Sequence, residues 1–330
     1  MFLRPCQHPP CGIREKKFVL VKLVPVSTSK FFKLEHIANR VWAVISSDPT
    51  WMMSNAGIVD LGGQTLVWDT GTSPRAAVEL KRVAEELTGR TVGLVINSHH
   101  HLDHSLGNQV FAGSSIFSTG MTRDLMRARF KRLIEEVKEF PDWIAQTKTQ
   151  LETVTDDFAR RALEFDLAEM EMLSEFMPNF KPTLPTITFE GSLGFHGTLR
   201  TARAIGFGAG HTGSDTVLHL PEDKILFAGD LVLVNHIPWM GHGNPEAWLE
   251  RITDLESLEP MTQIVPGHGP VATRDSIPGM RQTLLEIIAL ADVPDADALL
   301  QAQVPEAWRA WGLPSGFRGN LQFLFNRKQA

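Results

Sequence analysis

Ser98-His99-His100-His101-Leu102-Asp103-His104 is the stretch that decides the fold of this 330-residue chain. It follows an apolar run typical of a buried strand, Val92-Gly-Leu-Val-Ile96, and has the spacing H-x-H-x-D-H. Metal binding explains such a density of histidine and aspartate better than core packing does. Because alternate side chains of an extended segment point the same way, His99 and His101 are expected to face together and His100 to be a spectator.

Three later segments each place one more potential ligand beside glycine at the end of an apolar run. They are Gly210-His211-Thr212, Ala228-Gly229-Asp230 and Gly267-His268-Gly269. Glycine lets the backbone of such segments approach a site closely. Both cysteines, Cys6 and Cys11, lie near the N-terminus, which leaves no thiolate in the body of the chain. The sequence therefore predicts a metal site built from imidazoles and carboxylates.

Together with the turn Asp69-Thr-Gly71, this ordered set of motifs resembles the metallo-β-lactamase superfamily from about residue 40 to 290. The resemblance implies an α/β fold, the αββα sandwich in which two mixed β-sheets are flanked by helices. It also implies two metal ions, with Asp230 as a bridge between them. The implied ligands are His99, His101 and His211 for the first ion, and Asp103, His104 and His268 for the second.

The resemblance further implies that a hydroxide bridging the two ions attacks the substrate. Asp103 and Asp230 are the predicted catalytic residues, since Asp103 can orient the hydroxide and move its proton while Asp230 bridges the ions. Zinc is the default metal, and iron or manganese remain alternatives because no thiolate selects zinc.

Further residues are predicted to support the ligands or to form the substrate pocket. Hydrogen bonds to the ligand histidines are expected from Asp69, Ser98, Thr212 and Asp215, with a turn or capping role as the alternative for each. A pocket wall is expected from His236, Trp239 and Met240, with loop packing as the alternative.

The rest of the chain divides into four regions. Residues 1–30 are predicted to be a disordered N-terminal extension, and residues 31–292 to form the metallo-β-lactamase-type domain. Residues 121–180 have helical spacing and are predicted to be an insertion that either covers the metal cleft or pairs with a second copy in a homodimer. Residues 293–330 form a C-terminal segment without a clear pattern.

Composition and charge narrow the partners. With 32 basic against 38 acidic residues, the net charge of −6 gives no electrostatic footprint for nucleic acid or an anionic membrane. No apolar run is long enough to span a membrane. A small-molecule substrate and a cytoplasmic location are therefore expected; secretion or a periplasmic location stays open because residues 18–26 are apolar apart from Lys22.

The expected substrate is a small, largely apolar ester, thioester or lactone. Asp230 and the lack of a cysteine in the body of the chain speak against the typical β-lactamase branches of the superfamily. The chain also contains no tyrosine, so the active-site tyrosine of lactonases is absent. The alternatives are a phosphodiesterase or nuclease, a hydrolytic dehalogenase of chlorinated aromatics, and a β-lactamase.

Overall fold

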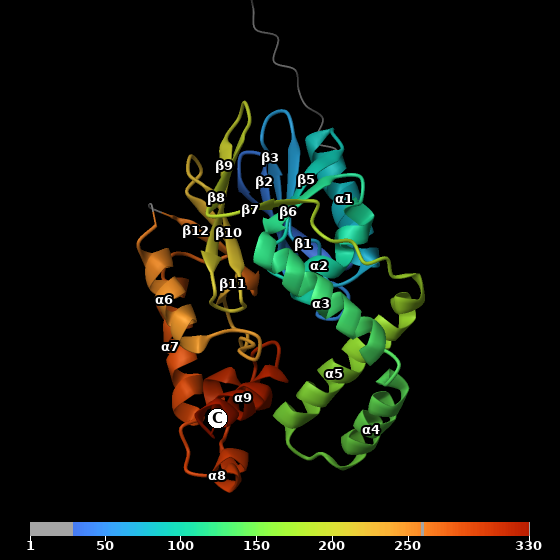
Figure 1. Ribbon diagram of the computed structural model, residues 1–330, viewed down its shortest axis with the longest axis vertical. Helices are drawn as coiled ribbons and strands as arrows, with labels where there is room; N and C mark the ends of the chain where they lie inside the picture. The colour runs from blue at the N-terminus through green and yellow to red at the C-terminus, as the bar shows by residue number, and fades with distance from the viewer. Residues whose placement is uncertain (1–28, 259–260, 330) are drawn as a thin grey trace, which may run out of the picture.

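The computed structural model describes residues 29–258 and 261–329, whose strands form two mixed sheets packed face to face (Figure 1). The first sheet has the order β1 (Phe32–Ala38), β2 (Val41–Ser46), β3 (Ala56–Asp60), β4 (Thr65–Trp68), β5 (Val92–Ile96), β6 (Ser115–Thr119), β7 (Ile187–Phe189). The second has the order β12 (Gln263–His268), β11 (Ile225–Leu233), β10 (Asp215–Leu220), β9 (Thr201–Gly208), β8 (Ser192–His196). In the first sheet, each neighbouring pair of strands from β4 to β7 is parallel, and in the second sheet β11 and β12 are parallel.

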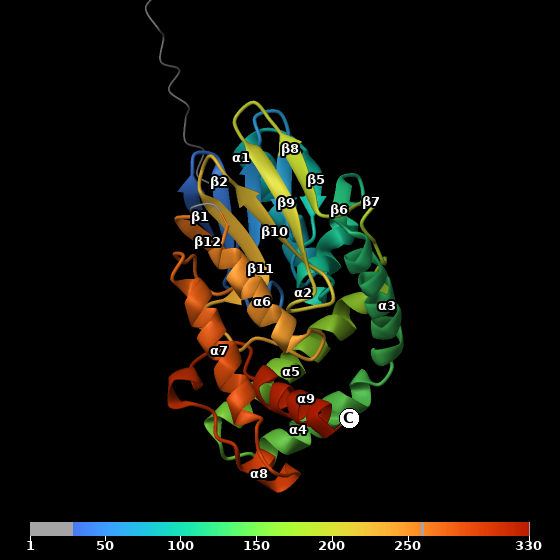
Figure 2. The same cartoon turned by 60° about the vertical axis from the view of Figure 1, so that its left-hand side comes forward.

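Helices cover the outer faces of both sheets. Helix α1 (Pro74–Thr88) packs on β4 and β5, whereas α6 (Pro245–Glu256) and α7 (Ser276–Leu290) pack on β11 (Figure 2). The order of layers is helix, sheet, sheet, helix. The predicted αββα sandwich is therefore confirmed.

A core of apolar side chains fills the space between the two sheets. Phe227 of β11 is fully buried there and lies with its ring 6.4 Å from that of Trp68 of β4. A Cβ atom at Gly57 of β3 would lie 2.3 Å from the Phe227 ring, so only glycine leaves room for this aromatic contact. The two sheets are thus matched in shape across their interface.

Local sequence signals explain where α1 begins and ends and how β3 turns into β4. Ser73 caps the helix by accepting a hydrogen bond from the Ala76 N–H at 3.2 Å, and Pro74 occupies the first turn. Gly89 ends the helix in the left-handed conformation with φ of 72°. The Gly62-Gly63 turn joins β3 to its antiparallel neighbour β4, with Gly62 at φ of 86°.

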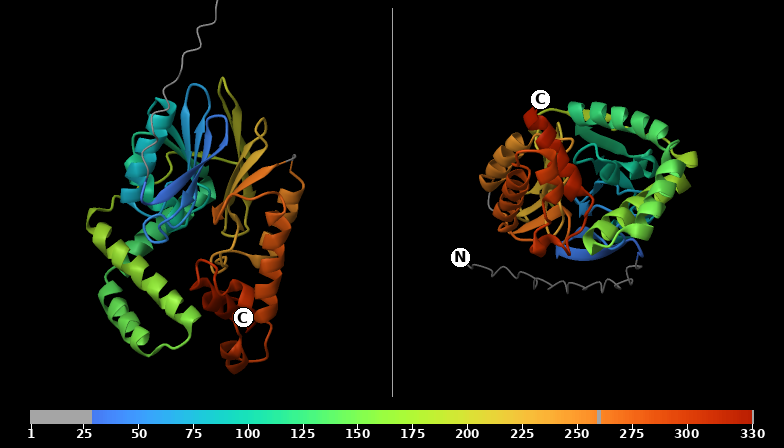
Figure 3. Two further views of the ribbon diagram at one scale, coloured as in Figure 1. Left: turned by 180° about the vertical axis from the view of Figure 1, so that it is seen from behind. Right: turned by 90° about the horizontal axis from the view of Figure 1, so that it is seen from below.

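Residues 121–180 contain three helices: α3 (Gly120–Glu136), α4 (Phe140–Thr153) and α5 (Asp157–Phe176). They share a small core with Leu102, which lies within the histidine motif at the start of the short helix α2 (Leu102–Ser105), and with Leu106 just after that helix. Figure 3 shows these helices at the same end of the sandwich as α8 (Ala296–Gln301) and α9 (Gly316–Gln329).

The C-terminal segment is more ordered than its sequence pattern predicts. Helix α9 buries Phe317, Leu321 and Leu324 in the core beside α7. The helical spacing is hidden in the sequence because Asn320 also faces inward. Its side chain is satisfied by the Met240 N–H at 2.7 Å and the Pro238 carbonyl at 2.5 Å.

Two predictions concern membranes and the N-terminus. Within residues 29–258 and 261–329, no helix has the length and apolar character needed to cross a membrane. The predicted extension at residues 1–30 falls almost wholly outside the described residues, as do Cys6 and Cys11.

We expect Phe227→Ala to lower the free energy of unfolding by about 3–5 kcal/mol, because it empties space between the two sheets that neither backbone can refill. Urea unfolding followed by circular dichroism would measure the change. Leu300→Ala, at an exposed side chain of α8, should change it by less than about 0.5 kcal/mol. Equal effects of the two substitutions would contradict this account of the core.

Candidate metal centre

The predicted ligands lie where strands of the two sheets end. The H-x-H-x-D-H motif follows β5 of the first sheet, whereas His211 lies in the loop between β9 and β10 of the second. Asp230 belongs to β11, and His268 is the last residue of β12. Both sheets thus contribute polar side chains to one place at their shared edge.

A first group contains His99, His101, His211 and Asp230, whose potential ligand atoms all lie within 4.8 Å of one another. Nε2 of His211 is 3.0 Å from Nδ1 of His101 and 3.3 Å from Oδ2 of Asp230. Nε2 of His99 lies 4.0 Å from the same carboxylate oxygen. These imidazoles therefore converge on one point beside Asp230.

A second group contains Asp103, His104 and His268, again with ligand atoms within 4.8 Å of one another. Oδ2 of Asp103 is 3.3 Å from Nε2 of His104 and 3.2 Å from Nε2 of His268. Asp230 reaches this group as well, since its Oδ1 is 3.1 Å from Nε2 of His104 and its Oδ2 is 3.4 Å from Nε2 of His268. The Asp230 carboxylate thus lies between the two groups.

Unsatisfied polar atoms show that this donor set fits cations. Within the described part of the chain, Nε2 of His99, Nε2 of His104 and Oδ1 of Asp230 are buried without a hydrogen-bond partner of acceptable geometry. Each such atom costs about 1–3 kcal/mol when it stays unpaired. Imidazole nitrogen and carboxylate oxygen are the donors that zinc and similar transition metals accept. The two groups could therefore hold two metal ions.

Electrostatics divides the two groups. Burial lowers the pKa of His99 and His101 well below the usual range and that of His211 to about 4, so these rings are neutral at pH 7, as metal ligands must be. Burial also disfavours the charged form of His268, but Asp230 and Asp103 outweigh it and raise its pKa to about 9. Burial acts against the charged form of His104 too, but Asp103, Asp230 and Asp69 raise its pKa well above the usual range. The second group therefore favours positive charge, which a bound metal ion would also supply.

Asp69 and Ser98 hold two of these imidazoles from behind. The Asp69 carboxylate accepts hydrogen bonds from Nδ1 of His104 at 2.8 Å and from the Ser98 hydroxyl at 2.7 Å. Since that hydroxyl donates to Asp69, it can accept from Nδ1 of His99, which is 2.9 Å away. Both rings are therefore oriented with Nε2 toward the centre.

Thr212 and Asp215 do not have the predicted bonds to a ligand ring. Asp215 instead accepts from the backbone N–H of Thr212 at 3.0 Å and from its hydroxyl at 2.7 Å. Nδ1 of His211 has no hydrogen-bond partner among the residues that the structure describes. The two side chains thus fix the loop that carries His211 and leave the ring itself unbonded on that side.

The candidate ligands open onto a cavity of 310 Å³. Trp239 lines this cavity, as expected for a pocket wall, whereas His236 lines a neighbouring one. The prediction for Met240 needs correction: its side chain is fully buried in the core because its backbone N–H is drawn to Asn320.

The cavity also has walls that sequence reasoning missed. Arg129 of α3 and Glu169 of α5 line it, so the insertion reaches the site. Burial, together with Asp103 and Asp166, raises the pKa of Glu169 to about 7. The available signal was periodicity, since Glu169 falls four residues after Phe165 and four before Leu173 on the inward face of α5.

His242 and the C-terminal segment complete the cavity wall. Nδ1 of His242 is 2.9 Å from Nε2 of His101, so a neutral His101 whose Nδ1 faces the centre can donate to it. Leu313 and Ser315 close the opposite side. The sequence offers no pattern that places residues so far along the chain beside the histidine motif.

The family model described as the metallo-beta-lactamase superfamily matches residues 49–268, which include all seven candidate ligands. The chain belongs to this superfamily. It is thus a superfamily hydrolase with a histidine and aspartate cluster that could bind metal ions.

Solved structures share the superfamily fold. A metallo-β-lactamase from Pontibacter korlensis is 19% identical, with a TM-score of 0.55, over 77% of this chain and 99% of that chain. TMB-1 is 15% identical at the same TM-score, over 77% and 97%. VMB-1 is 17% identical, also at 0.55, over 78% and 99%. At these identities the similarity shows the fold alone.

We expect Asp69→Asn to weaken metal binding about 10–100-fold, because the amide cannot accept from Ser98 and His104 as the carboxylate does. Titration of metal-free protein against a chromophoric chelator would measure the affinity. Asp254→Asn, at an exposed carboxylate of α6, serves as the control. Unchanged affinity in the Asp69 variant would show that this residue does not orient the ligands.

Proposed function

We propose that this protein is a hydrolase with two metal ions, zinc by default, that cleaves a small and largely apolar ester, thioester or lactone. The observation that carries the proposal is the Asp230 carboxylate, which lies within 3.1 to 4.0 Å of imidazole nitrogens from both groups. A carboxylate in that place can bridge two cations.

His99, His101 and His211 would hold one ion, Asp103, His104 and His268 the other, and Asp230 both. Bound there, the metals would supply Lewis acidity and lower the pKa of a coordinated water toward about 7. The carboxylates of Asp103 and Asp230 offset the charge of two adjacent dications, which neutral imidazoles cannot do. The donor set therefore suits a pair of ions better than one.

Asp103 is the chain's own candidate for moving a proton. Its side chain keeps 15% of its surface exposed and lines the cavity, whereas the side chain of Asp230 is only 6% exposed. The histidines beside it hold the pKa of Asp103 well below its usual range, although burial acts in the opposite direction. Asp103 is thus ionised at pH 7, so its carboxylate can accept a hydrogen bond from the attacking water and pass the proton on, whereas so low a pKa does not let it keep the proton.

The cavity wall supports an apolar substrate. Apolar side chains that include Met53, Ile237 and Trp239 line it and can exclude water from the reacting group. The cationic Arg129 of the wall is already paired with Glu136 at 2.8 Å, and Glu169 is partly ionised at pH 7, so the wall does not favour a polyanion. These features support an uncharged substrate with one electrophilic carbonyl.

A β-lactam is the second candidate, because one of the similar solved structures, from Pontibacter korlensis, is named a metallo-β-lactamase. Asp230 and the absence of a cysteine from the body of the chain favour the ester, thioester or lactone instead. A phosphodiester and a chlorinated aromatic are further alternatives to be tested.

Removing the bridge should abolish activity. We expect Asp230→Ala to lose at least one of about two bound metal ions and to lower kcat/KM more than about 100-fold. Elemental analysis and steady-state kinetics would measure both. His196→Ala, at an exposed ring on β8, should leave metal content and rate unchanged. Wild-type protein that binds no transition metal under any loading would end the binuclear proposal.

A substrate panel tests the proposed chemistry. Metal-loaded protein should hydrolyse a simple thioester, ester or lactone with kcat/KM at least about tenfold above that for nitrocefin, bis-p-nitrophenyl phosphate or a chlorinated aromatic. Arg129 is already paired with Glu136 and offers little to the two anions, and the chlorinated aromatic lacks a carbonyl for a metal to polarise. Chelation should remove the activity and zinc should restore it. Faster cleavage of the phosphodiester or of nitrocefin would overturn this choice of substrate.

A further inference from the structure

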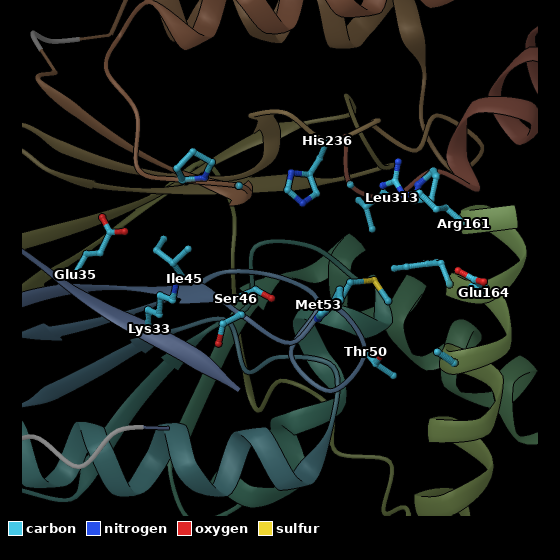
Figure 4. A pocket seen from close by; sticks show the side chains of 18 residues that line it. Lys33, Glu35, Ile45, Ser46, Thr50, Met53, Arg161, Glu164, His236 and Leu313 are labelled. Atoms are coloured by element: carbon cyan, nitrogen blue, oxygen red, sulfur yellow. The ribbon is translucent and has the colours of Figure 1, made fainter. Parts of the chain in front are cut away.

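A second cavity, of 770 Å³, adjoins the metal cavity. Figure 4 shows His236 on one side of it and Ser46 and Met53 on the other, with Lys33 and Glu35 toward one end and Arg161 and Glu164 toward the other. Elements from both sheets, the insertion and the C-terminal segment meet around it. Nothing in the proposed chemistry uses this space.

The two cavities share their walls. Met53 and Leu313 line both of them. Three further pairs of adjacent residues are divided between the cavities. The second cavity is lined by Ala168, His236 and Gly269, and the metal cavity by their neighbours Glu169, Ile237 and His268. The cavities are therefore two compartments of one cleft, with Met53 and Leu313 at the boundary.

The boundary at Leu313 is held in an unusual conformation. Its φ of 55° lies in the left-handed region, which a branched apolar residue rarely adopts. Hydrogen bonds fix the residues beside it: the Gly312 N–H donates to Asn235 at 3.0 Å, and the Arg161 guanidinium donates to the Trp311 carbonyl at 2.8 Å. Strain that the surroundings maintain in this way is typical of functional sites.

The second cavity has a half-buried lining of mixed polarity and a charged rim. The half-buried apolar side chains include Ile45, Phe165, Ala168 and Leu313, and the half-buried polar ones include Ser46, Thr50 and His236. Lys33, Glu35 and Glu164 are exposed, and Arg161 already donates to backbone carbonyls. Since charges of both signs occur at the rim, the cavity offers apolar contact without attraction for a polyanion.

We propose that this second cavity binds the apolar acyl or alkyl body of the substrate while the scissile carbonyl lies in the metal cavity. The proposal rests on the proposed function and narrows it to substrates with an extended hydrocarbon chain. Met53 and Leu313 determine specificity, because the chain passes between them from one compartment to the other.

A tryptophan that fills the second cavity should remove the preference for a long chain. In Ala168→Trp, kcat/KM for p-nitrophenyl decanoate should fall at least about tenfold, whereas that for p-nitrophenyl acetate should stay within about twofold, because only the long chain loses apolar contact. Ala162→Trp, the same change on α5 at a residue that lines neither compartment, is the matched control. Thr50→Trp, from the opposite wall, repeats the test should the first variant fail to fold.

Calorimetric binding of decanol to the full chain as purified gives a readout that is independent of hydrolysis, because decanol has no bond for the enzyme to hydrolyse. Decanol should bind the wild type and the Ala162 variant, and bind at least about tenfold more weakly to the tryptophan variants that fill the cavity. If wild-type protein cleaves no ester, thioester or lactone, the proposed function fails, and decanol binding alone decides on the cavity. Equal losses for both esters, or decanol binding that ignores the substitutions, would overturn the inference.

Discussion

The Asp230 carboxylate is the constraint on which this site depends. A buried carboxylate is costly unless positive charge or hydrogen-bond donors surround it. Here four imidazoles from three segments of the chain surround it: His99 and His104 after β5, His211 between β9 and β10, and His268 at the end of β12. Gly267 leaves the carboxylate room, because a Cβ there would lie 1.8 Å from Oδ1 of Asp230. The backbone of the second sheet is thus shaped around one carboxylate.

That constraint explains why much of the molecule was predictable. Metal ligands must be histidine or aspartate at defined spacing, so the motif from His99 to His104 and the glycine-flanked His211, Asp230 and His268 are visible in the sequence. The caps of α1 were predictable for a similar reason, since the first N–H groups of a helix and the left-handed residue after it demand particular side chains. In these places local chemistry permits few alternatives.

The cavity walls could not be predicted, because nothing local determines them. Leu313 and Glu169 reach the site only through packing between helices that are distant in the sequence, and Met240 was misassigned because being near in sequence to Trp239 says nothing about direction. Thr212 and Asp215 have the residue types of ligand-supporting groups, yet their short separation lets them bond to each other first. Long-range packing, in contrast to ligand chemistry, tolerates many sequences.

The division of ligands between the sheets has a mechanical consequence. His99 to His104 follow a strand of the first sheet, whereas His211, Asp230 and His268 come from the second. Ions shared by these residues would act as cross-links that fasten one half of the sandwich to the other. A ligand that binds only the folded state raises the free energy of unfolding by RT ln(1 + [L]/Kd). Metal binding would therefore also stabilise the contact between the two halves. The concentration of available metal would therefore determine the resistance of the fold to heat and protease as well as the rate of hydrolysis.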